Sequence, residues 1–349
     1  MPHSVRLEPS SRTFEVQDGE TVLAAGLRQG FALPFGCQSG GCGSCRVRLS
    51  SGTVGYPPAG APALSEAEVD AGYILMCFAR PHSDLVLQLH QPEMLEQLRP
   101  RTLPVRVASH RPLSHDVVGL WVRLPRPAQG DPPFRYLPGQ YVDFLLPDGR
   151  RRSFSIANAS EDGEQLEFHL RVTPGGFFAH YVQDEMPDRT ILRFQGPLGA
   201  FYVREGADMS APRPAVLMAG GTGFGPIKAM LERQFARGLR RPFHLFWGAR
   251  STRDLYHDAL AREWAATQRN FRYTPVLSEP DTGWSGERGF VHEAVLRTHP
   301  DLSGHEVYMA GPPVMIHAGK RAFVGAGLDA DHLYYDSFDY AFETWPALG

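Results

Sequence analysis

The chain has 349 residues, enough for two or three domains, and its 42% hydrophobic and 21% charged content is ordinary for a globular protein. A formal net charge of −3 and the lack of a basic block argue against a nucleic-acid-binding protein. No run of about 18 apolar residues is present, and the N-terminus lacks the apolar segment of a signal peptide, so we expect a cytoplasmic protein without membrane insertion.

The first hundred residues predict a small mixed domain. The expected elements are a hairpin over 4–16, a helix over 21–30, strands over 45–49, 74–79 and 85–90, and a helical turn over 64–68. The strand over 74–79 would carry the last cysteine of the chain. Residues 91–102 change composition and hold two prolines, which indicates a linker, so we place this domain at 1–98.

All four cysteines lie in this region. They form the pattern Cys37-x4-Cys42-x2-Cys45, and Cys77 follows after 31 further residues. This spacing is typical of the ligands of a plant-type 2Fe–2S cluster, and the glycines of the loop let it curl tightly around one. A structural zinc site and two disulfides are the alternatives. Zinc usually takes two close Cys-x2-Cys pairs, of which one is present, and disulfides need an oxidising compartment.

Two further domains follow in chain order. From 103 to 205, short strands separated by Gly and Pro turns indicate an antiparallel barrel, with one helix over 176–183. Over 206–349 strands and helices alternate, which is typical of a doubly wound α/β domain with a parallel sheet. The fold class is therefore multidomain, α+β followed by α/β. The expected barrel strands are 104–108, 117–124, 140–145, 153–157, 166–172 and 191–196.

The barrel carries a run, Arg152-Ser-Phe-Ser155, whose chemistry suits a flavin nucleotide. Arg152 can pair with a phosphate, Phe154 can pack on the ribityl chain or the ring, and the hydroxyl of Ser155 can hydrogen-bond near flavin N5. The pattern is weak by itself, because an exposed basic strand edge would look similar.

The α/β domain opens with a glycine-rich turn, Gly221-Thr-Gly-Phe-Gly-Pro226, between a buried strand and a helix. Glycines there let the backbone approach a pyrophosphate, and Pro226 suits the first helical position. The turn therefore predicts a dinucleotide site.

With these motifs in this order, the chain resembles the NAD(P)H-dependent, ferredoxin reductase-type iron–sulfur flavoproteins over nearly its full length. The run from Arg151 to Asn158 is close to that of the CDP-6-deoxy-glucoseen reductase group. The chain as a whole resembles this group and the reductase components of methane monooxygenase and benzoate dioxygenase. The resemblance implies a β-grasp 2Fe–2S ferredoxin domain, an FAD-binding barrel and an NAD-binding domain. Electrons would pass from NADH through FAD and the cluster to a partner oxygenase, dehydrase or other redox protein.

The resemblance also implies roles for individual residues. Ser155, Thr222, Asp336 and Phe338 would act at the reaction site, with Phe338 covering the flavin ring and Asp336 helping to position it. The C-terminal aromatic residues could instead merely pin the terminus to the core. The residues expected to bind FAD or the pyridine nucleotide are Arg152, Ser153, Phe154, Ser155, His169, Leu170, Arg171, Gly175, Gly176, Phe177, Phe178, Gly221, Thr222, Gly223, Pro226, Arg250, Gly311, Pro312 and Phe338.

The sequence departs from the family pattern at two positions. Ala179 stands where Ser or Thr usually offers a hydroxyl to the flavin phosphate, so we expect weaker FAD binding. Ala310 replaces the cysteine beside the nicotinamide, so we expect slower hydride transfer. Arg250 and Arg253 could meet a 2′-phosphate, but the Gly-Ala-Arg sequence resembles that of NADH users, and NADH is preferred over NADPH.

Two other functions stay open at this point. A redox-sensing module would carry the same cofactors but oxidise NADH slowly. A free-flavin or ferric reductase would turn over with a small acceptor and without a partner protein.

Overall fold

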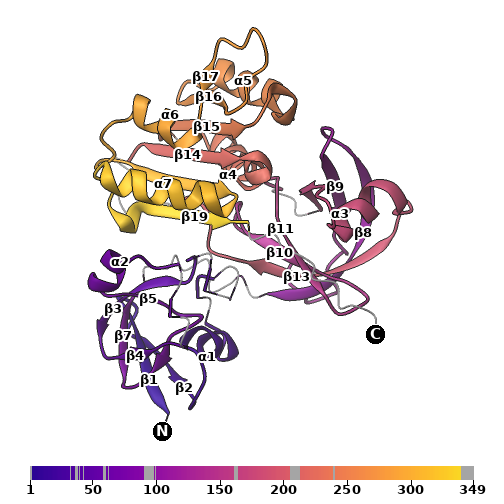
Figure 1. The fold of residues 1–349 in the computed structure, drawn as a ribbon. Coiled ribbons are helices and arrows are strands. Elements are labelled where there is room, and N and C mark those ends of the chain that lie inside the picture. The colour runs from indigo at the N-terminus through magenta and orange to yellow at the C-terminus, as the bar shows by residue number, and fades with distance from the viewer. Residues whose placement is uncertain are drawn as a thin grey trace, which may run out of the picture. The chain divides into compact units, whose positions relative to one another are not determined.

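A computed structural model describes residues 2–31, 33–35, 38, 40–41, 43–57, 60–61, 63–89, 98, 100–160, 164–204, 213–238 and 240–338. Contacts divide the chain into two compact units, Met1–Arg101 with Gly196–Ala200, and Thr102–Gln195 with Phe201–Gly349 (Figure 1). In the described part, no helix combines the length and the apolar character needed to cross a membrane.

The first unit holds a five-stranded mixed sheet of order β2-β1-β7-β3-β5. Its helix α1 begins where the Thr21 hydroxyl accepts the N–H of Ala24, and it buries Val22, Leu23 and Ala25. The elements are β1 (His3–Glu8), β2 (Arg12–Val16), α1 (Val22–Arg28), β3 (Arg46–Ser51), β4 (Val54–Gly55), α2 (Glu66–Asp70), β5 (Tyr73–Leu75), β6 (Arg80–Pro81) and β7 (Leu85–Gln88). The hairpin is antiparallel, whereas β1 and β7 run parallel.

Cys77 lies in a turn, so the strand predicted over 74–79 is wrong beyond Leu75. The carbonyl of Leu75 accepts the N–H groups of both Phe78 and Ala79, at 3.0 and 2.8 Å, and this bends the chain back. Met76 and Ala79 are nevertheless fully buried, and an apolar run of this kind cannot distinguish a strand from a buried turn. Most of the predicted linker over 91–102 lies outside the described residues, and its last two residues already belong to β8.

The barrel is a six-stranded sheet of order β11-β10-β13-β8-β9-β12, in which β10 runs antiparallel to β11 and β9 runs antiparallel to both β8 and β12. A bridge between Ile156 and Phe168 joins its two end strands and closes it. Four phenylalanines, Phe144, Phe168, Phe178 and Phe194, fill the core. The elements are β8 (Arg101–Pro112), β9 (Val117–Arg123), β10 (Tyr141–Leu145), β11 (Arg151–Ser155), β12 (Gln165–Arg171), α3 (Phe177–His180), the π-helix η2 (Tyr181–Glu185) and β13 (Ile191–Leu198).

The last part is a parallel sheet of order β17-β16-β15-β14-β18-β19, as predicted for a doubly wound domain (Figure 1). Helices α4 and α5 pack on one face of the sheet and α6 and α7 on the other. The elements are β14 (Ala215–Gly220), η3 (Gly221–Gly223), α4 (Phe224–Ala236), β15 (Phe243–Ala249), η4 (Thr252–Asp254), α5 (Asp258–Thr267), β16 (Phe271–Leu277), β17 (Glu287–Arg288), α6 (Val291–Thr298), β18 (Glu306–Gly311), α7 (Pro313–Gly325), η5 (Ala330–His332) and β19 (Leu333–Ser337).

The α/β part differs from the prediction at the start of helix α4. Helix α4 begins at Phe224, so Pro226 is its third residue and not its first. Proline is tolerated there because the N–H groups of the first helical turn have no partner within the helix. Helix α5 begins at Asp258, since Ser251 and Asp254 cap a 3₁₀ turn just before it.

Candidate functional site

The structure describes two of the four predicted cluster ligands, Cys45 and Cys77, while Cys37 and Cys42 lie outside the described residues. Both thiols are buried, and their sulfur atoms are 3.1 Å apart. This distance exceeds the length of a disulfide bond by about 1 Å. The two sulfur atoms are close enough to bind the same cluster. Gly40 and Gly43 have positive φ angles of 74° and 72°, which supports the tight curl expected of the loop.

The predicted flavin residues lie on β11, next to β10. Arg152 and Phe154 pair with Phe144 and Val142, and therefore lie on one face of the strand pair. The ring of Phe154 lies 5.7 Å from that of Phe178, so the two predicted flavin segments do meet. On the other face, Ser153 donates a hydrogen bond to Asp143 at 2.6 Å, and its hydroxyl therefore already has a partner.

The second predicted flavin segment surrounds the glycine turn before α3. Gly175 has a φ angle of 80°, and the side chain of Phe177 is about half exposed. Leu170, Phe178 and Ala179 are buried in the barrel core, so only their backbone groups remain for a cofactor. Ala179 is thus a core residue, and the expectation of weaker FAD binding stays a prediction.

The glycine-rich turn at the carboxyl end of β14 lies close to two other segments. A Cβ atom at Gly223 would clash with the carbonyl oxygen of Ala310, so glycine is required for this approach to β18. Gly221 has a φ angle of 54°, and a Cβ there would lie 2.8 Å from the guanidinium of Arg171. Arg171 forms an ion pair with Asp116 at 3.2 Å, and its buried Nε has no hydrogen-bond partner in the described part of the chain.

The C-terminal segment joins the barrel to the α/β half, which is the parallel sheet β14–β19 with its helices. Asp336 on β19 pairs in register with Ala310, and its carboxylate accepts a hydrogen bond from the hydroxyl of Ser155 at 3.1 Å. The N–H of Phe338 donates to the carbonyl of Gly311 at 2.9 Å. The ring of Tyr334 stacks on Tyr308 in the core, so this tyrosine does pin the segment, whereas Asp336 reaches the barrel.

The side chain of His169 does not face the barrel core. It lies between β12 and the α/β half, 2.8 Å from the carboxylate of Glu167 and 3.0 Å from the hydroxyl of Tyr256. Lys228 of α4 completes this group with an ion pair to Glu167 at 2.9 Å. Burial raises the pKa of Glu167, but the hydrogen bond from His169 and the charge of Lys228 outweigh it, and the pKa is about 2. Sequence reasoning missed this network; the only signal was two polar residues alternating on an otherwise apolar strand.

Arg250 follows β15 and is exposed, as a nucleotide-binding residue at a strand end would be. Its carbonyl accepts the N–H of Glu279, at the end of neighbouring β16, at 2.8 Å. An acidic residue that the prediction did not consider therefore stands beside the arginine.

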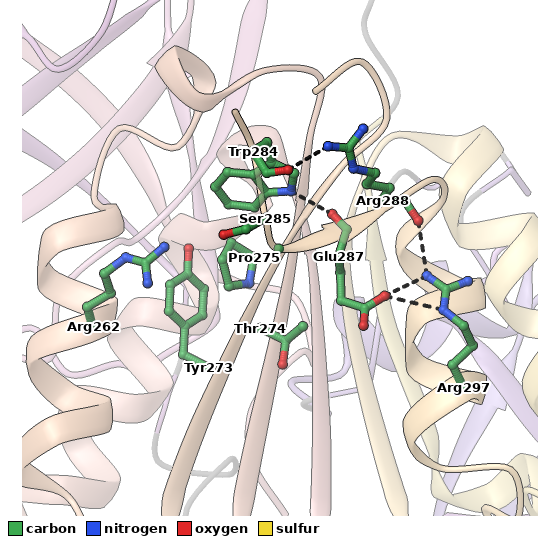
Figure 2. A pocket seen from close by; sticks show the side chains of 10 residues that line it. Arg262, Tyr273, Thr274, Pro275, Trp284, Ser285, Glu287, Arg288 and Arg297 are labelled. Atoms are coloured by element: carbon green, nitrogen blue, oxygen red, sulfur yellow. Dashed lines mark hydrogen bonds and ion pairs between the residues drawn. The ribbon is translucent and has the colours of Figure 1, made fainter. Parts of the chain in front are cut away.

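A cavity of about 630 Å³ lies elsewhere, at the outer edge of β16 (Figure 2). Its lining includes Trp284, Arg262 of α5 and Arg297 of α6, and it holds none of the predicted site residues. Arg297 is ion-paired with Glu287 at 2.8 Å and Arg262 with Asp258 at 2.6 Å. A third arginine of the lining, Arg288, donates to the carbonyl of Trp284. Because the cavity holds none of the residues of the glycine-rich turn, that turn remains the candidate nucleotide site.

Models of known protein families match three segments of the chain. Residues 5–82 match the 2Fe-2S iron-sulfur cluster binding domain, residues 104–202 the oxidoreductase FAD-binding domain and residues 217–321 the oxidoreductase NAD-binding domain. Together these matches confirm the predicted order of the three folds.

Individual relatives match along almost the whole chain. The CDP-6-deoxy-L-threo-D-glycero-4-hexulose-3-dehydrase reductase of Yersinia pestis is 36% identical over 97% of this chain and 99% of its own. The phenol 2-monooxygenase reductase component DmpP of Pseudomonas sp. strain CF600 is 34% identical over 97% and 95%. Among solved structures, the cytochrome P450 reductase GcoB of Amycolatopsis is 28% identical, with a TM-score of 0.72 over 96% of this chain and 98% of that one.

These matches confirm the predicted family, enzyme class and cofactors. The chain belongs to the family of NAD(P)H-dependent iron–sulfur flavoprotein reductases, and it transfers electrons from a pyridine nucleotide through FAD and a 2Fe–2S cluster to a partner protein.

Proposed function

We propose that hydride transfer takes place between Ser155 of the barrel and the carboxyl ends of β14 and β18. The hydrogen bond of 3.1 Å between Ser155 and Asp336 is the observation that carries this proposal, because it joins the flavin-type strand to β19, beside β18. Thr222 sits in the glycine turn packed on β18, and it is buried, as a residue between two stacked rings would be. Open-sheet proteins bind nucleotides at this edge of the sheet.

The carboxylate of Asp336 can only accept hydrogen bonds, so it fixes the direction of the Ser155 hydroxyl. When bound, FAD supplies the two-electron to one-electron conversion, and the cluster supplies single-electron transfer. The chain's own task is orientation: Ser155 and Asp336 hold one side of the flavin site, and Thr222 and Phe338 limit access from the other.

The binding roles follow from charge and packing. Arg152 would meet the flavin phosphate and Phe154 the flavin itself, with backbone groups around Gly175 and Gly176 assisting. Arg171 lies against the glycine-rich turn with part of its guanidinium unsatisfied, which fits a cation that binds the pyrophosphate of the pyridine nucleotide. Cys37, Cys42, Cys45 and Cys77 would hold the cluster.

We propose NADH as the preferred donor, and a cytoplasmic location where NADH and reduced thiols are both available. Glu279 stands beside Arg250 at adjacent strand ends, and its negative charge would disfavour the 2′-phosphate that NADPH carries. The relatives named above serve a dehydrase and a monooxygenase, and we propose that the acceptor here is a redox protein of one of these two classes.

Anaerobic titration of the holoenzyme with NADH, followed by visible and EPR spectroscopy, tests the proposal. Uptake of about three electron equivalents is expected, two by the flavin and one by the cluster. NADPH should reduce the flavin more slowly at equal concentration. A flavin that becomes reduced while the cluster stays oxidised would refute the relay, and the small-acceptor and sensor alternatives would then be preferred.

A further inference from the structure

Strand β12 buries side chains on both of its faces. Leu166, Phe168 and Leu170 fill the barrel core, as alternation predicts for a half-buried strand. Glu167 and His169 point the other way, yet they are only 8% and 7% exposed. Since charged residues are almost never fully buried without partners, the groups that cover them need to be identified.

Lys228 supplies the first contact across to the α/β half. Its ammonium group donates to Glu167 and to the carbonyl of Ala157, both at 2.9 Å, and pairs with Glu232 at 2.8 Å. All three of its donors are thus used. Ala157 comes two residues after Ser155. Lys228 therefore binds both β12 and the segment that directly follows the flavin-type strand β11.

His169 and Tyr256 supply the second contact. Burial lowers the pKa of His169, so its ring is neutral and has one N–H. Glu167 can only accept, so Nε2 of His169 donates to it and Nδ1 accepts the hydroxyl proton of Tyr256. The ring of Tyr256 meets Trp247 edge-on, and the Trp247 indole N–H donates to the carbonyl of Gly221 at 3.0 Å.

The contacts therefore run without a break from the flavin strand to the glycine-rich turn. Helix α4 starts directly after this turn, so Lys228 lies little more than one helical turn beyond it. A Cβ at Gly225 of α4 would lie 3.4 Å from side-chain atoms of both Ala157 and His169, so the start of the helix packs directly on these two residues.

The same residues also have the spacing of a metal site, but the charges argue against one. Ligand atoms of Glu167, His169 and His257 lie within 4.8 Å of one another. The ammonium of Lys228 already occupies one carboxylate oxygen of Glu167, and both ring nitrogens of His169 have partners. A divalent ion would have to displace these contacts next to a buried positive charge.

We propose that Glu167, His169, Lys228 and Tyr256 form a positioning network that fixes the nucleotide turn against the flavin strand and so sets the distance over which hydride is transferred. The inference rests on the proposed function, because it takes the turn as the nucleotide site. Reaction rates depend steeply on such distances, and a misplacement of about 1 Å from a remote change can cost about a hundredfold in rate.

The variant Tyr256→Phe tests the network with little loss of packing. It removes only the hydroxyl that His169 binds and keeps the ring contact with Trp247. The limiting rate of flavin reduction by NADH, measured by anaerobic stopped flow on the holoenzyme, should fall about tenfold. The dissociation constant of NADH from the same traces should change by less than about twofold, because the nucleotide contacts remain.

Tyr273→Phe is the matched control. Tyr273 also loses one buried hydroxyl bond, to Asp258 at 2.9 Å, but this bond lies within the α/β half, between β16 and α5. The control should keep the parent rate while its thermal stability falls about as much as that of Tyr256→Phe. Equal limiting rates in the two variants would overturn the proposal, and so would weaker NADH binding with an unchanged limiting rate.

A second pair of variants covers the case in which Tyr256→Phe does not fold. Lys228→Met alone leaves Glu167 charged and buried, whereas the double variant Glu167→Gln with Lys228→Met removes both charges. Lys228→Met should therefore fold poorly and retain less FAD than the parent. The double variant should bind as much FAD as the parent, but its flavin should be reduced by NADH about tenfold more slowly. A double variant with the parent rate would refute the positioning role. If the parent itself were not reduced by NADH, the proposed function would fail instead.

Discussion

At the scale of single residues, the hydrogen bond between Ser155 and Asp336 joins positions 181 residues apart. Each had been predicted from its own motif, and no spacing in the sequence links them. A hydroxyl held by a carboxylate has a fixed direction, and a fixed dipole at the reacting atoms is more effective than a mobile one.

Ser155→Ala is therefore expected to slow flavin reduction by NADH by about ten- to a hundredfold, because the hydroxyl oxygen that Asp336 orients no longer accepts a hydrogen bond at the reacting atoms and the flavin is held less accurately. Single-turnover stopped flow on the holoenzyme measures it. Thr190→Val, which removes a barrel hydroxyl bonded to the carbonyl of Pro187, should leave the rate unchanged. If both variants behaved alike, Ser155 would have no special role.

Ala310 is fully buried in β18, and its carbonyl lies against Gly223. In relatives of this kind a cysteine is expected there, and its thiol would add bulk and polarisability next to the nicotinamide. Ala310→Cys should thus raise the limiting rate of flavin reduction about threefold, with a small loss of stability from the added atom. A variant that is correctly loaded with FAD and reduces it no faster than the parent would contradict this.

At the scale of elements, the sequence predicted those with a clear period and missed those whose signal depends on tertiary contacts. All six barrel strands and the strand–helix alternation were expected, since alternation and glycine turns mark them locally. The sequence does not predict strand β19; for this segment it leaves open a cover over the flavin or aromatic residues that pin the terminus to the core. Its pairing with β18 is a long-range contact, and its buried Leu333 and Tyr335 looked no different from a terminal apolar cluster.

The site divides in the same way. Cys45, Cys77 and the glycine-rich turn could be predicted as site candidates because metal ligation and close backbone approach restrict residue types at fixed spacing. Lys228, Tyr256 and Asp116 could not be predicted, because each contacts a partner on a distant element.

A pair of histidines, His244 on β15 and His299 at the end of α6, should make the stability of the α/β half depend on pH. His244 lies 3.0 Å from His299 and 2.9 Å from the hydroxyl of Thr274. Burial, with smaller effects from His299 and Arg272, lowers the pKa of His244 from 6.5 to about 4. Between these values the unfolded chain binds a proton that the folded chain does not, so stability is complete above pH 6.5 and is lost as the pH falls toward 4.

One such group changes the free energy of unfolding by about 1.4 kcal/mol per pH unit within this window. Replacing His244 by Asn keeps the hydrogen-bonding capacity and removes the titration. Urea unfolding at pH 6.5 and 5.5 should therefore show a loss smaller by about 1 kcal/mol in His244→Asn than in the parent, because the unfolded histidine is already half protonated at pH 6.5. The same loss in both proteins would show that His244 does not titrate in this range.

At the scale of the whole molecule, charge is unevenly distributed along the chain. Residues 1–98 carry six Arg and ten Asp or Glu, a net charge of −4, which leaves +1 for the remaining residues. The domain that passes electrons out of the protein is thus its acidic part. An acidic surface would be attracted to a basic patch on an acceptor protein, and such attraction mainly increases the rate of association.

This uneven charge separates a protein acceptor from a small one. With a purified oxygenase or dehydrase component limiting, the rate of its reduction should fall about three- to tenfold between 50 and 500 mM NaCl, because salt screens attraction between exposed charges. Ferricyanide reduction by the same holoenzyme, run in parallel, should not fall, because its small anion gains nothing from an acidic surface. If reduction of neither protein depends on salt, docking is not electrostatic. If free FMN alone is reduced at the full rate and neither component is, a small-molecule acceptor becomes the better explanation.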